Sequence, residues 1–531
     1  MPIQRIQADS PRSRLFRQRA KLDDPFQELL RAVPSSSLPS SPSLRVRRVV
    51  KREALGAAGG AVAGTAPASS LAPDSLACSL SLSARVVAAV RAGRSLTQAL
   101  AVFRDRPPTT RAAVQEISYG TLRGYGHGEF ILGRLLQRAL TDPVGEALLL
   151  VALYRLRSRP EAAHTVVDQA VSAAGEISGG AYKGLVNGVL RNYLRQRTVL
   201  EAARADDEVA WHQHPRWWLK RLQRAYPADW PAIVAADNAP PPMTLRVNRR
   251  HVTAADYLAR LSAGEVSGEA VGEAGGEAGG KLAGDSIDAS IGESTTDSAA
   301  GSVNASASAL AGRLLGGAAL LLDKPVAVER LPGFAEGWVS VQDAGAQQAA
   351  EWLRPADGER VLDACAAPGG KSAHLLELAD IALTAIDIDR ERVQRIGETL
   401  RRLGLSATVR VADCRDLSWW DGVPFDAILA DVPCSASGVV RRHPDAKYLR
   451  RESDVRRFAT LQSEILDRLW PLLAAGGRFL YATCSLFPEE NGAQIDAFLY
   501  RHPDARRQRS QQLLPSAEHD GFFYALLEKA S

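Results

Sequence analysis

Two cysteines in the last third of the chain follow hydrophobic, strand-like runs. Cys434 lies in the segment DVPCS just after the run at 426–432, and Cys484 ends the run at 478–484. Parallel strands of an open α/β sheet end along one edge, where ligands bind, so both thiols can reach one pocket. Cysteine is often only a small buried hydrophobic residue. These two, however, stand beside polar residues where a strand opens into a loop, which favours a chemical role.

Two thiols in one pocket suit methyl transfer to carbon 5 of cytosine. That carbon is not nucleophilic enough to take a methyl group directly, but a thiolate that adds to carbon 6 makes it enamine-like. The route needs a reactive cysteine, an acid or hydrogen-bond donor near the ring nitrogens, and a base for the carbon 5 proton. Cys434, Cys484 and Asp431 can supply these groups. The residues alone do not decide which cysteine attacks.

A strand, a tight glycine turn and a helix follow one another within residues 360–379. Small residues in the turn let a ligand approach the backbone, and the helix N-terminus offers free N–H groups. The turn matches neither GxGxxG nor GxxxxGK[ST], so by itself it is a weak signal of cofactor binding. Its residues are Cys365, Ala366, Ala367, Pro368, Gly369, Gly370 and Lys371.

Three aspartates end the strand-like runs that come next. Asp387 ends the second run, Asp413 the third, and Asp431 lies at the end of the fourth. A carboxylate after the second strand can accept hydrogen bonds from ribose hydroxyls. Any one of these aspartates could equally be a turn cap. All of them together with the glycine turn favour a nucleoside-like cofactor in one crevice.

The segment 441–457 is basic, with seven Lys or Arg residues and three acidic ones. Beside the mouth of a pocket, such an excess suits the phosphate backbone of a nucleic acid. The candidate RNA contacts are Arg441, Arg442, His443 and Lys447. His443 is also a candidate general base, although a loop histidine before a proline is more often structural.

The elements that must hold these residues are predicted by hydrophobic patterning over 341–531. Strand-like and helical runs alternate, which is typical of a doubly wound, mostly parallel, Rossmann-like α/β sheet. The strand-like runs are 360–366, 383–389, 408–413, 426–432, 478–484 and 521–529. The helical runs are 371–379, 390–404, 461–476 and 489–502.

The rest of the chain divides into three parts. Helix-period runs over 81–230 predict an all-α bundle of about six helices, the last ending in Arg191, Arg195 and Arg197 on a face that is either solvated or in contact with RNA. Residues 231–340 predict a small α+β domain, interrupted by an acidic low-complexity insertion at 264–308. Residues 1–80, rich in Arg, Ser, Pro and Ala, predict a disordered basic tail.

Composition narrows the classes of protein further. The 531 residues carry a net charge of only +5, which excludes a histone-like polycation. The sequence has no run of about 18 apolar residues, so no membrane-spanning helix is expected. The five cysteines include no CxxC pair, so the sequence predicts neither a disulfide framework nor a zinc site. This cysteine content instead predicts a reducing compartment. We therefore expect a cytoplasmic protein, acting as a monomer, without a membrane or metal partner.

Several motifs together resemble the RNA 5-methylcytosine methyltransferases. They are DACAAPGGK, DVPCSASGVVRRHPDAK, YATCSLFPEEN and DGFFYALLEK, together with the strand-end Asp387 and Asp413. Residues 81–230 are similar to the antitermination-factor NusB domain that some members carry before the catalytic domain. The resemblance covers about 81–263 and 314–531. It departs from the family at Cys414 and Gly345, where a small residue and a serine are usual.

The resemblance implies a cofactor, a substrate and roles for the two cysteines. The cofactor is S-adenosylmethionine, bound by Cys365 to Lys371 and by Asp387, Asp413 and Asp431. The cysteine of the TC motif, Cys484, is implied to be the nucleophile, and that of the PC motif, Cys434, to assist product release. The implied substrate of members with a NusB-like domain is a cytosine of 16S, small-subunit ribosomal RNA.

Three other functions remain open. A DNA cytosine methyltransferase would use the PC cysteine as nucleophile, but the TC motif, the helical domain and the missing target-recognition region argue against it. A tRNA or other rRNA 5-methylcytosine methyltransferase would share the catalytic domain, and here the helical domain favours small-subunit ribosomal RNA. A non-catalytic RNA-binding or antitermination factor would need only 81–230, which the intact catalytic motifs make improbable.

Overall fold

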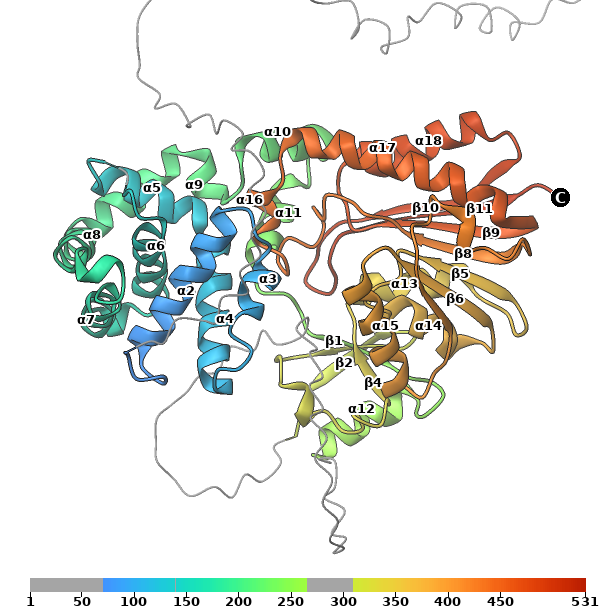
Figure 1. Cartoon of the computed structure of the whole chain (residues 1–531), viewed down its shortest axis with the longest axis horizontal. Coiled ribbons are helices and arrows are strands. Elements are labelled where there is room, and N and C mark those ends of the chain that lie inside the picture. The colour runs from blue at the N-terminus through green and yellow to red at the C-terminus, as the bar shows by residue number, and fades with distance from the viewer. Residues whose placement is uncertain (1–69, 139, 265–308) are drawn as a thin grey trace, which may run out of the picture. The chain divides into compact units, whose positions relative to one another are not determined.

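The computed structural model describes residues 70–138, 140–264 and 309–531, all within one unit of the chain, Gly64–Ser531. The predictions of a disordered tail and an acidic insertion therefore fall almost wholly outside the described residues. Within those residues the chain forms the helical, small α+β and Rossmann-like parts that the sequence predicts (Figure 1). No helix among the described residues is long and apolar enough to cross a membrane.

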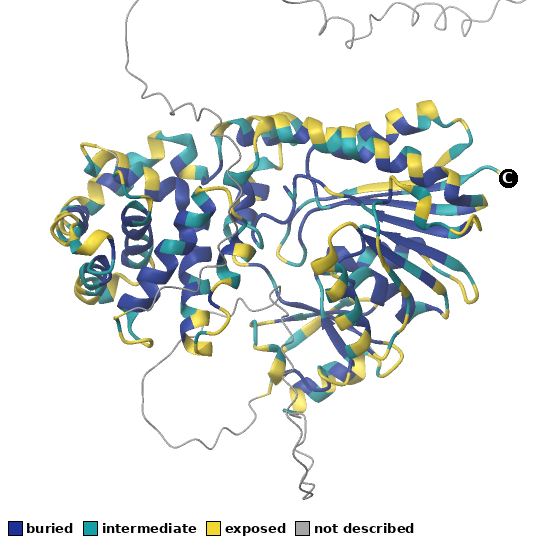
Figure 2. Cartoon of the chain, viewed as in Figure 1, coloured by how far each residue is buried: buried dark blue, intermediate teal, exposed yellow. Residues whose placement is uncertain are grey.

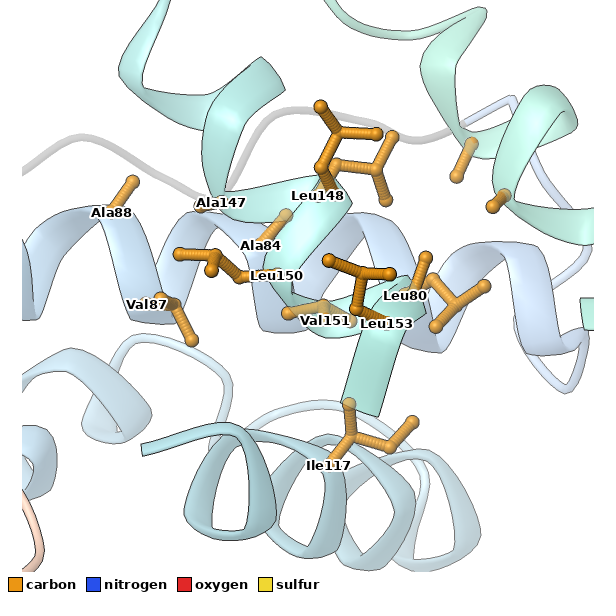
Figure 3. Close-up of a cluster of buried hydrophobic side chains, with 14 of the residues drawn as sticks. Leu80, Ala84, Val87, Ala88, Ile117, Ala147, Leu148, Leu150, Val151 and Leu153 are labelled. Atoms are coloured by element: carbon orange, nitrogen blue, oxygen red, sulfur yellow. The ribbon is translucent and has the colours of Figure 1, made fainter. Parts of the chain in front are cut away.

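The helical part packs around α2 and α6. Leu80, Ala84 and Val87 of α2 lie against Leu150 and Leu153 of α6, and all five side chains are buried (Figure 3). Helix α6 has apolar residues on every side because it is surrounded by other helices. The helices of this part are α2 (Leu76–Arg91), α3 (Leu96–Ala101), α4 (Pro108–Arg123), α5 (Tyr125–Leu135), α6 (Pro143–Ser158), α7 (Ala163–Ala174), α8 (Lys183–Ala203) and α9 (Glu208–His212). The next two helices, α10 (Arg216–Ala225) and α11 (Trp230–Asn238), form a separate core with Val440, Val455 and Phe487 of the C-terminal part, so the predicted bundle ends before residue 230.

The small domain is a four-stranded antiparallel sheet in the order β2-β3-β1-β4. Helix α12 covers it through Tyr257 and Leu261, which are fully buried against the strands. Thr253 caps the start of this helix through its side chain, which explains why the helix begins there. The elements are β1 (Thr244–Val247), α12 (Ala254–Ala263), β2 (Gly312–Gly316), β3 (Ala319–Leu322) and β4 (Val339–Val341).

The C-terminal part is a seven-stranded sheet in the order β10-β11-β9-β8-β5-β6-β7. The five strands from β9 to β7 are parallel, whereas β11 runs antiparallel to both its neighbours. Its strands are β5 (Arg360–Ala364), β6 (Ala382–Asp387), β7 (Thr408–Val411), β8 (Phe425–Asp431), β9 (Leu473–Thr483), β10 (Ala505–Leu513) and β11 (Phe522–Lys529). Its helices are α13 (Ala344–Leu353), α14 (Gly370–Leu378), α15 (Arg390–Arg402), α16 (Ala446–Leu449), α17 (Glu452–Leu469) and α18 (Gly492–Arg501).

Helices cover both faces of this sheet. Helices α13, α14 and α15 pack on one face, and α17 and α18 on the other (Figure 1). The central strands are consequently buried on both sides, as Figure 2 shows, which explains their nearly continuous apolar sequence. The loops that leave the carboxyl ends of these strands carry the polar residues identified from the sequence.

The structure corrects three further sequence predictions. Helix α2 begins at Leu76, inside the predicted tail, because the Ser75 hydroxyl accepts a hydrogen bond from the backbone N–H of Cys78. The helix predicted at 461–476 instead spans Glu452–Leu469, since Pro471 follows and β9 begins two residues later. Strand β10 was missed because its exposed residues are mostly Arg and Gln, as suits the edge of a sheet.

Candidate active site

The glycine turn connects β5 to α14 and brings bare backbone to the edge of the sheet. Cys365 and Gly369 both have positive φ angles, of 61° and 100°. A Cβ atom at Gly369 would lie 3.0 Å from the Cα atom of Ile396, so a larger residue would be crowded as well as strained. The turn is pinned by a hydrogen bond from the N–H of Ala366 to the carbonyl of Ile386 on β6. A ligand can therefore approach the main chain closely here.

Asp387 and Asp413 lie at the ends of the next two strands, as predicted from the sequence. The Asp387 carboxylate is 3% exposed and accepts hydrogen bonds from the backbone N–H groups of Ala367 and Asp389, which joins it to the glycine turn. Asp413 is bound by the guanidinium group of Arg415 at 2.8 Å. That hydrogen bond lowers the pKa of Asp413, so its carboxylate stays ionised.

Asp431 at the end of β8 forms an ion pair with Lys371 from the first turn of α14. The Nζ atom of Lys371 lies 2.6 Å from the Oδ2 atom of Asp431. Although burial opposes the charge on the ammonium group, the Asp431 carboxylate raises the pKa of Lys371 overall. The pair is partly buried, and it joins the glycine turn to the strand that leads to Cys434.

The two cysteines meet, as their spacing predicts. Strands β8 and β9 are parallel neighbours in which Asp431 pairs with Ala482, and the sulfur atoms beyond their ends are 3.3 Å apart. The hydrogen bond to Cys484, followed by burial, raises the pKa of Cys434 well above its ordinary value. The Cys434 thiol therefore keeps its proton in this state, and Cys484 is the more exposed of the two.

Buried polar residues hold the two cysteine loops together, and the sequence analysis missed them. The Glu490 carboxylate accepts hydrogen bonds from the N–H and hydroxyl of Ser435, at 2.8 and 2.6 Å, and from the hydroxyl of Ser485, at 2.5 Å. Each serine directly follows one of the cysteines. The available signal was this repeated Cys-Ser pair together with the acidic residue in FPEEN. The network also includes Ser437, Gln462 and Asn491.

The structure contradicts the expectation that Arg441 and Arg442 contact phosphate directly. Both guanidinium groups bind the carboxylate of the buried Asp520, and that of Arg442 also lies 3.0 Å from Asp343. Although burial favours the neutral acid, the two cations hold the pKa of Asp520 below its ordinary value. These arginines fasten the loop after Cys434 to the segment before β11.

Lys447 is also unavailable to RNA. Its side chain is fully buried, and its Nζ atom donates to the side-chain oxygen of Asn238 at 3.1 Å. Burial lowers the pKa of Lys447 to about 7, opposed by the nearby Asp237, whose carboxylate contacts His214 at 3.1 Å. Of the four predicted RNA contacts, His443 keeps a partly exposed side chain and stays a candidate.

The site thus lies at the carboxyl ends of β5, β6, β7, β8 and β9, with the glycine turn and its neighbouring aspartates on one side and the two thiols on the other. Among the described residues, no group of three or more His, Cys, Asp and Glu is arranged to hold a metal ion. The arrangement suits covalent catalysis by a cysteine next to a bound nucleoside cofactor.

Comparison with known proteins gives three family matches along the chain. A model described as "16S rRNA methyltransferase RsmB/F" matches residues 350–528. A ferredoxin-like domain of RsmF/B-like methyltransferases matches residues 214–275, and the NusB family matches residues 81–195. The order of the three matches is that of the three parts of the fold.

Individual proteins agree with these matches. The chain is 42% identical over 450 residues to ribosomal RNA small subunit methyltransferase B of Vibrio cholerae, covering 82% of this chain and 94% of that protein. It is 42% identical over 453 residues to the protein of the same name from a strain of Escherichia coli, covering 83% and 96%. The crystal structure of PH0851 has the same fold, with a TM-score of 0.65 and 21% identity over 87% of this chain and 99% of that one.

Proposed function

Because the chain belongs to the RsmB/F family of 16S rRNA methyltransferases, we propose that it methylates carbon 5 of a cytosine in small-subunit ribosomal RNA, with S-adenosylmethionine as the methyl donor. The observation that carries this proposal is the contact of the Cys434 and Cys484 sulfur atoms, 3.3 Å apart, at the ends of adjacent parallel strands. We also propose that the enzyme acts in the cytoplasm, where its substrate is located.

The cradle beside the thiols fits S-adenosylmethionine. Gly369 leaves space that a Cβ atom would crowd, and α14 begins directly after it with free N–H groups. Asp387 suits the ribose hydroxyls, since each carboxylate oxygen has a second lone pair beyond its backbone hydrogen bond. Asp413 suits the base of the cofactor, and residues Cys365 to Lys371 suit the rest of the cofactor molecule. The bound cofactor would supply an electrophilic methyl group.

Cys484 acts as the nucleophile in the proposed reaction. Its thiolate donates an electron pair to carbon 6 of the cytosine, and the charge that passes into the ring makes carbon 5 able to take up the methyl group. Asp431 lies three residues before Cys434, held by Lys371, where a carboxyl can bind the ring nitrogen or amino group of the base. The greater exposure of Cys484 supports its assignment as the attacking residue.

Cys434 acts in product release. Removal of the carbon 5 proton restores the carbon 5–carbon 6 double bond and breaks the bond between carbon 6 and Cys484, which leaves as a thiolate. The hydrogen bond with Cys484 raises the pKa of Cys434 before reaction. Once Cys484 is bonded to carbon 6, that cause disappears, so Cys434 loses its own proton more easily and can serve as the base.

Bisulfite sequencing tests the substrate. Purified protein is incubated with S-adenosylmethionine and with RNA from a strain that lacks the gene, and 16S rRNA, other rRNA and tRNA are sequenced separately. We expect one cytosine of 16S rRNA to become resistant to conversion. Resistance confined to tRNA or to another rRNA would support the alternative substrates, and no new resistant cytosine would refute the proposal.

A further inference from the structure

A pocket lies in the helical part of the molecule and shares no residue with the candidate active site around the cysteines. It has a volume of about 620 Å³. Four arginines line it, from the end of α4, the end of α6, the middle of α8 and the turn after α8: Arg123, Arg157, Arg197 and Arg204. Four separate points of the chain thus bring guanidinium groups to one concave surface.

The buried side chain of His127 organises two of these arginines. Burial lowers the pKa of His127, which favours the neutral imidazole. Its Nδ1 atom faces the guanidinium groups of Arg157 and Arg204, which can only donate, so Nδ1 is the acceptor. Its Nε2 atom then carries the proton and lies 3.1 Å from a carboxylate oxygen of Glu201. The histidine therefore orients two cations without neutralising them.

The pocket lining carries an excess of positive charge. Glu201 is the one carboxylate among the lining residues, against four guanidinium groups. Its other oxygen already accepts a hydrogen bond from the Tyr193 hydroxyl at 3.1 Å. Burial lowers the pKa of Arg157, and the neighbouring charge of Arg204 lowers it further, although Tyr193 and Glu201 oppose this effect. An anion in the pocket would relieve this repulsion.

We propose that this pocket binds the phosphodiester backbone of the RNA substrate, an inference that rests on the proposed function. Arginine forks match phosphate oxygens in paired hydrogen bonds, and the volume is large enough for a nucleotide or two. A concave, half-buried site with a net excess of three positive charges differs from a solvated basic face, where charges are spread and fully hydrated.

Hydrogen bonds link the pocket wall to the segment that follows Cys434. Asn238, which lines the pocket, accepts from Lys447, and a guanidinium nitrogen of Arg123 donates to the carbonyl of Arg441 at 2.9 Å. The same stretch of chain therefore borders both the pocket and the cysteine loop.

The test replaces two pocket arginines and keeps a matched control on the same helix. The variant is Arg197→Gln with Arg204→Gln. The control is Arg195→Gln, since Arg195 is exposed and lies outside the pocket. It lies about 160° from Arg197 around α8, so the two arginines do not share the single face that the sequence pattern suggested. Each protein is titrated with 16S rRNA fragments over a range of salt concentrations, and methylation kinetics, S-adenosylmethionine binding and Tm are recorded.

We expect Kd and KM for the RNA to rise at least about tenfold in the double variant and to stay unchanged in the control. The slope of log Kd against log salt should fall by about 0.7 per lost phosphate contact. An unchanged Kd and salt slope would overturn the proposal. So would a lower Tm with reduced kcat at saturating RNA, which indicates a structural role.

Two further measurements distinguish an RNA phosphate from a small free anion, and failure of this proposal from failure of the proposed function. Inorganic phosphate and cytidine monophosphate are titrated into the wild type, where we expect binding far weaker than that of the RNA fragments. Tight binding of either small anion, lost in the double variant without a change in RNA affinity, would overturn the proposal in favour of a small ligand. If the wild-type protein binds S-adenosylmethionine but methylates no RNA, the proposed function is refuted. The salt dependence of RNA binding would still show whether the pocket binds RNA.

Discussion

Replacing Cys434 with alanine should trap the enzyme on its product. The substitution leaves Cys484 in place, so attack on carbon 6 and methyl uptake at carbon 5 still proceed. It removes the side chain whose sulfur lies 3.3 Å from the nucleophile and which we assign to proton removal. Methylated RNA should therefore stay covalently bound to Cys484.

The size of the effect follows from the position of the thiol. A general base placed next to the reacting bond accelerates proton transfer by about 10²- to 10⁴-fold. Its loss should slow elimination by the same factor, equivalent to about 3–5 kcal/mol of barrier. The fold should tolerate the change, because Cys→Ala removes a single sulfur atom and Glu490 still binds Ser435 and Ser485. The complex should then accumulate to nearly one RNA per protein.

A denaturing gel measures the trapped species as a slowly migrating band that protease removes and that contains both protein and RNA. Cys484→Ala should give no band and no turnover. Cys78→Ala is the matched control, because Cys78 is a buried cysteine of α2 in the helical part, and it should turn over without a band. A band in Cys484→Ala but not in Cys434→Ala would refute our assignment and support the order used by DNA cytosine methyltransferases.

Three other outcomes are expected. In Asp387→Ala, calorimetry should show the affinity for S-adenosylmethionine falling at least about tenfold, since a hydrogen bond to a charged group is lost; an unchanged affinity would remove this carboxylate from the cofactor site. Burial raises the pKa of Asp363 to about 7, so the folded state holds this proton more tightly and the free energy of unfolding should fall as pH rises from about 4 to 7. Urea titrations should show this fall reduced by up to about 1.4 kcal/mol per pH unit in Asp363→Asn, and parallel curves for the two proteins would contradict it. Deleting residues 264–308 should leave methylation and Tm nearly unchanged, because their low-complexity composition offers neither a core nor a ligand, and a drop in Tm of many degrees would contradict this prediction.

The arrangement of the catalytic residues was largely predictable because it depends on local patterns. Cys434 and Cys484 each follow a run of apolar residues, and parallel strands bring their carboxyl ends to one edge of the sheet. The glycine turn and the strand-end Asp387 followed from the same logic. Strand order then fixed the neighbours, since β8 and β9 pair directly.

Arg441, Arg442 and Lys447 were mispredicted as RNA contacts because their partners are distant in sequence. Arg442 and its ion-pair partner Asp520 are separated by 78 positions, and Lys447 and Asn238 by 209. A local excess of positive charge predicts a phosphate surface only when no buried carboxylate is available, and the sequence pattern cannot show which carboxylates fold over it. The pocket around His127 escaped notice for the same reason, since its four arginines come from four separate segments.

The ties between Asp520 and the loop after Cys434 have a consequence for the timing of synthesis. A ribosome makes the chain from the N-terminus, and early domains fold first. Asp520 and β11 follow both cysteines in the chain, yet Asp520 anchors both Arg441 and Arg442, and Gly521 donates its N–H to the carbonyl of Gly438. Until the segment around residue 520 has been made, the loop after Cys434 lacks these anchors, although Glu490 can already bind Ser435 and Ser485. A chain truncated before residue 520 would carry both cysteines but leave that loop unfastened.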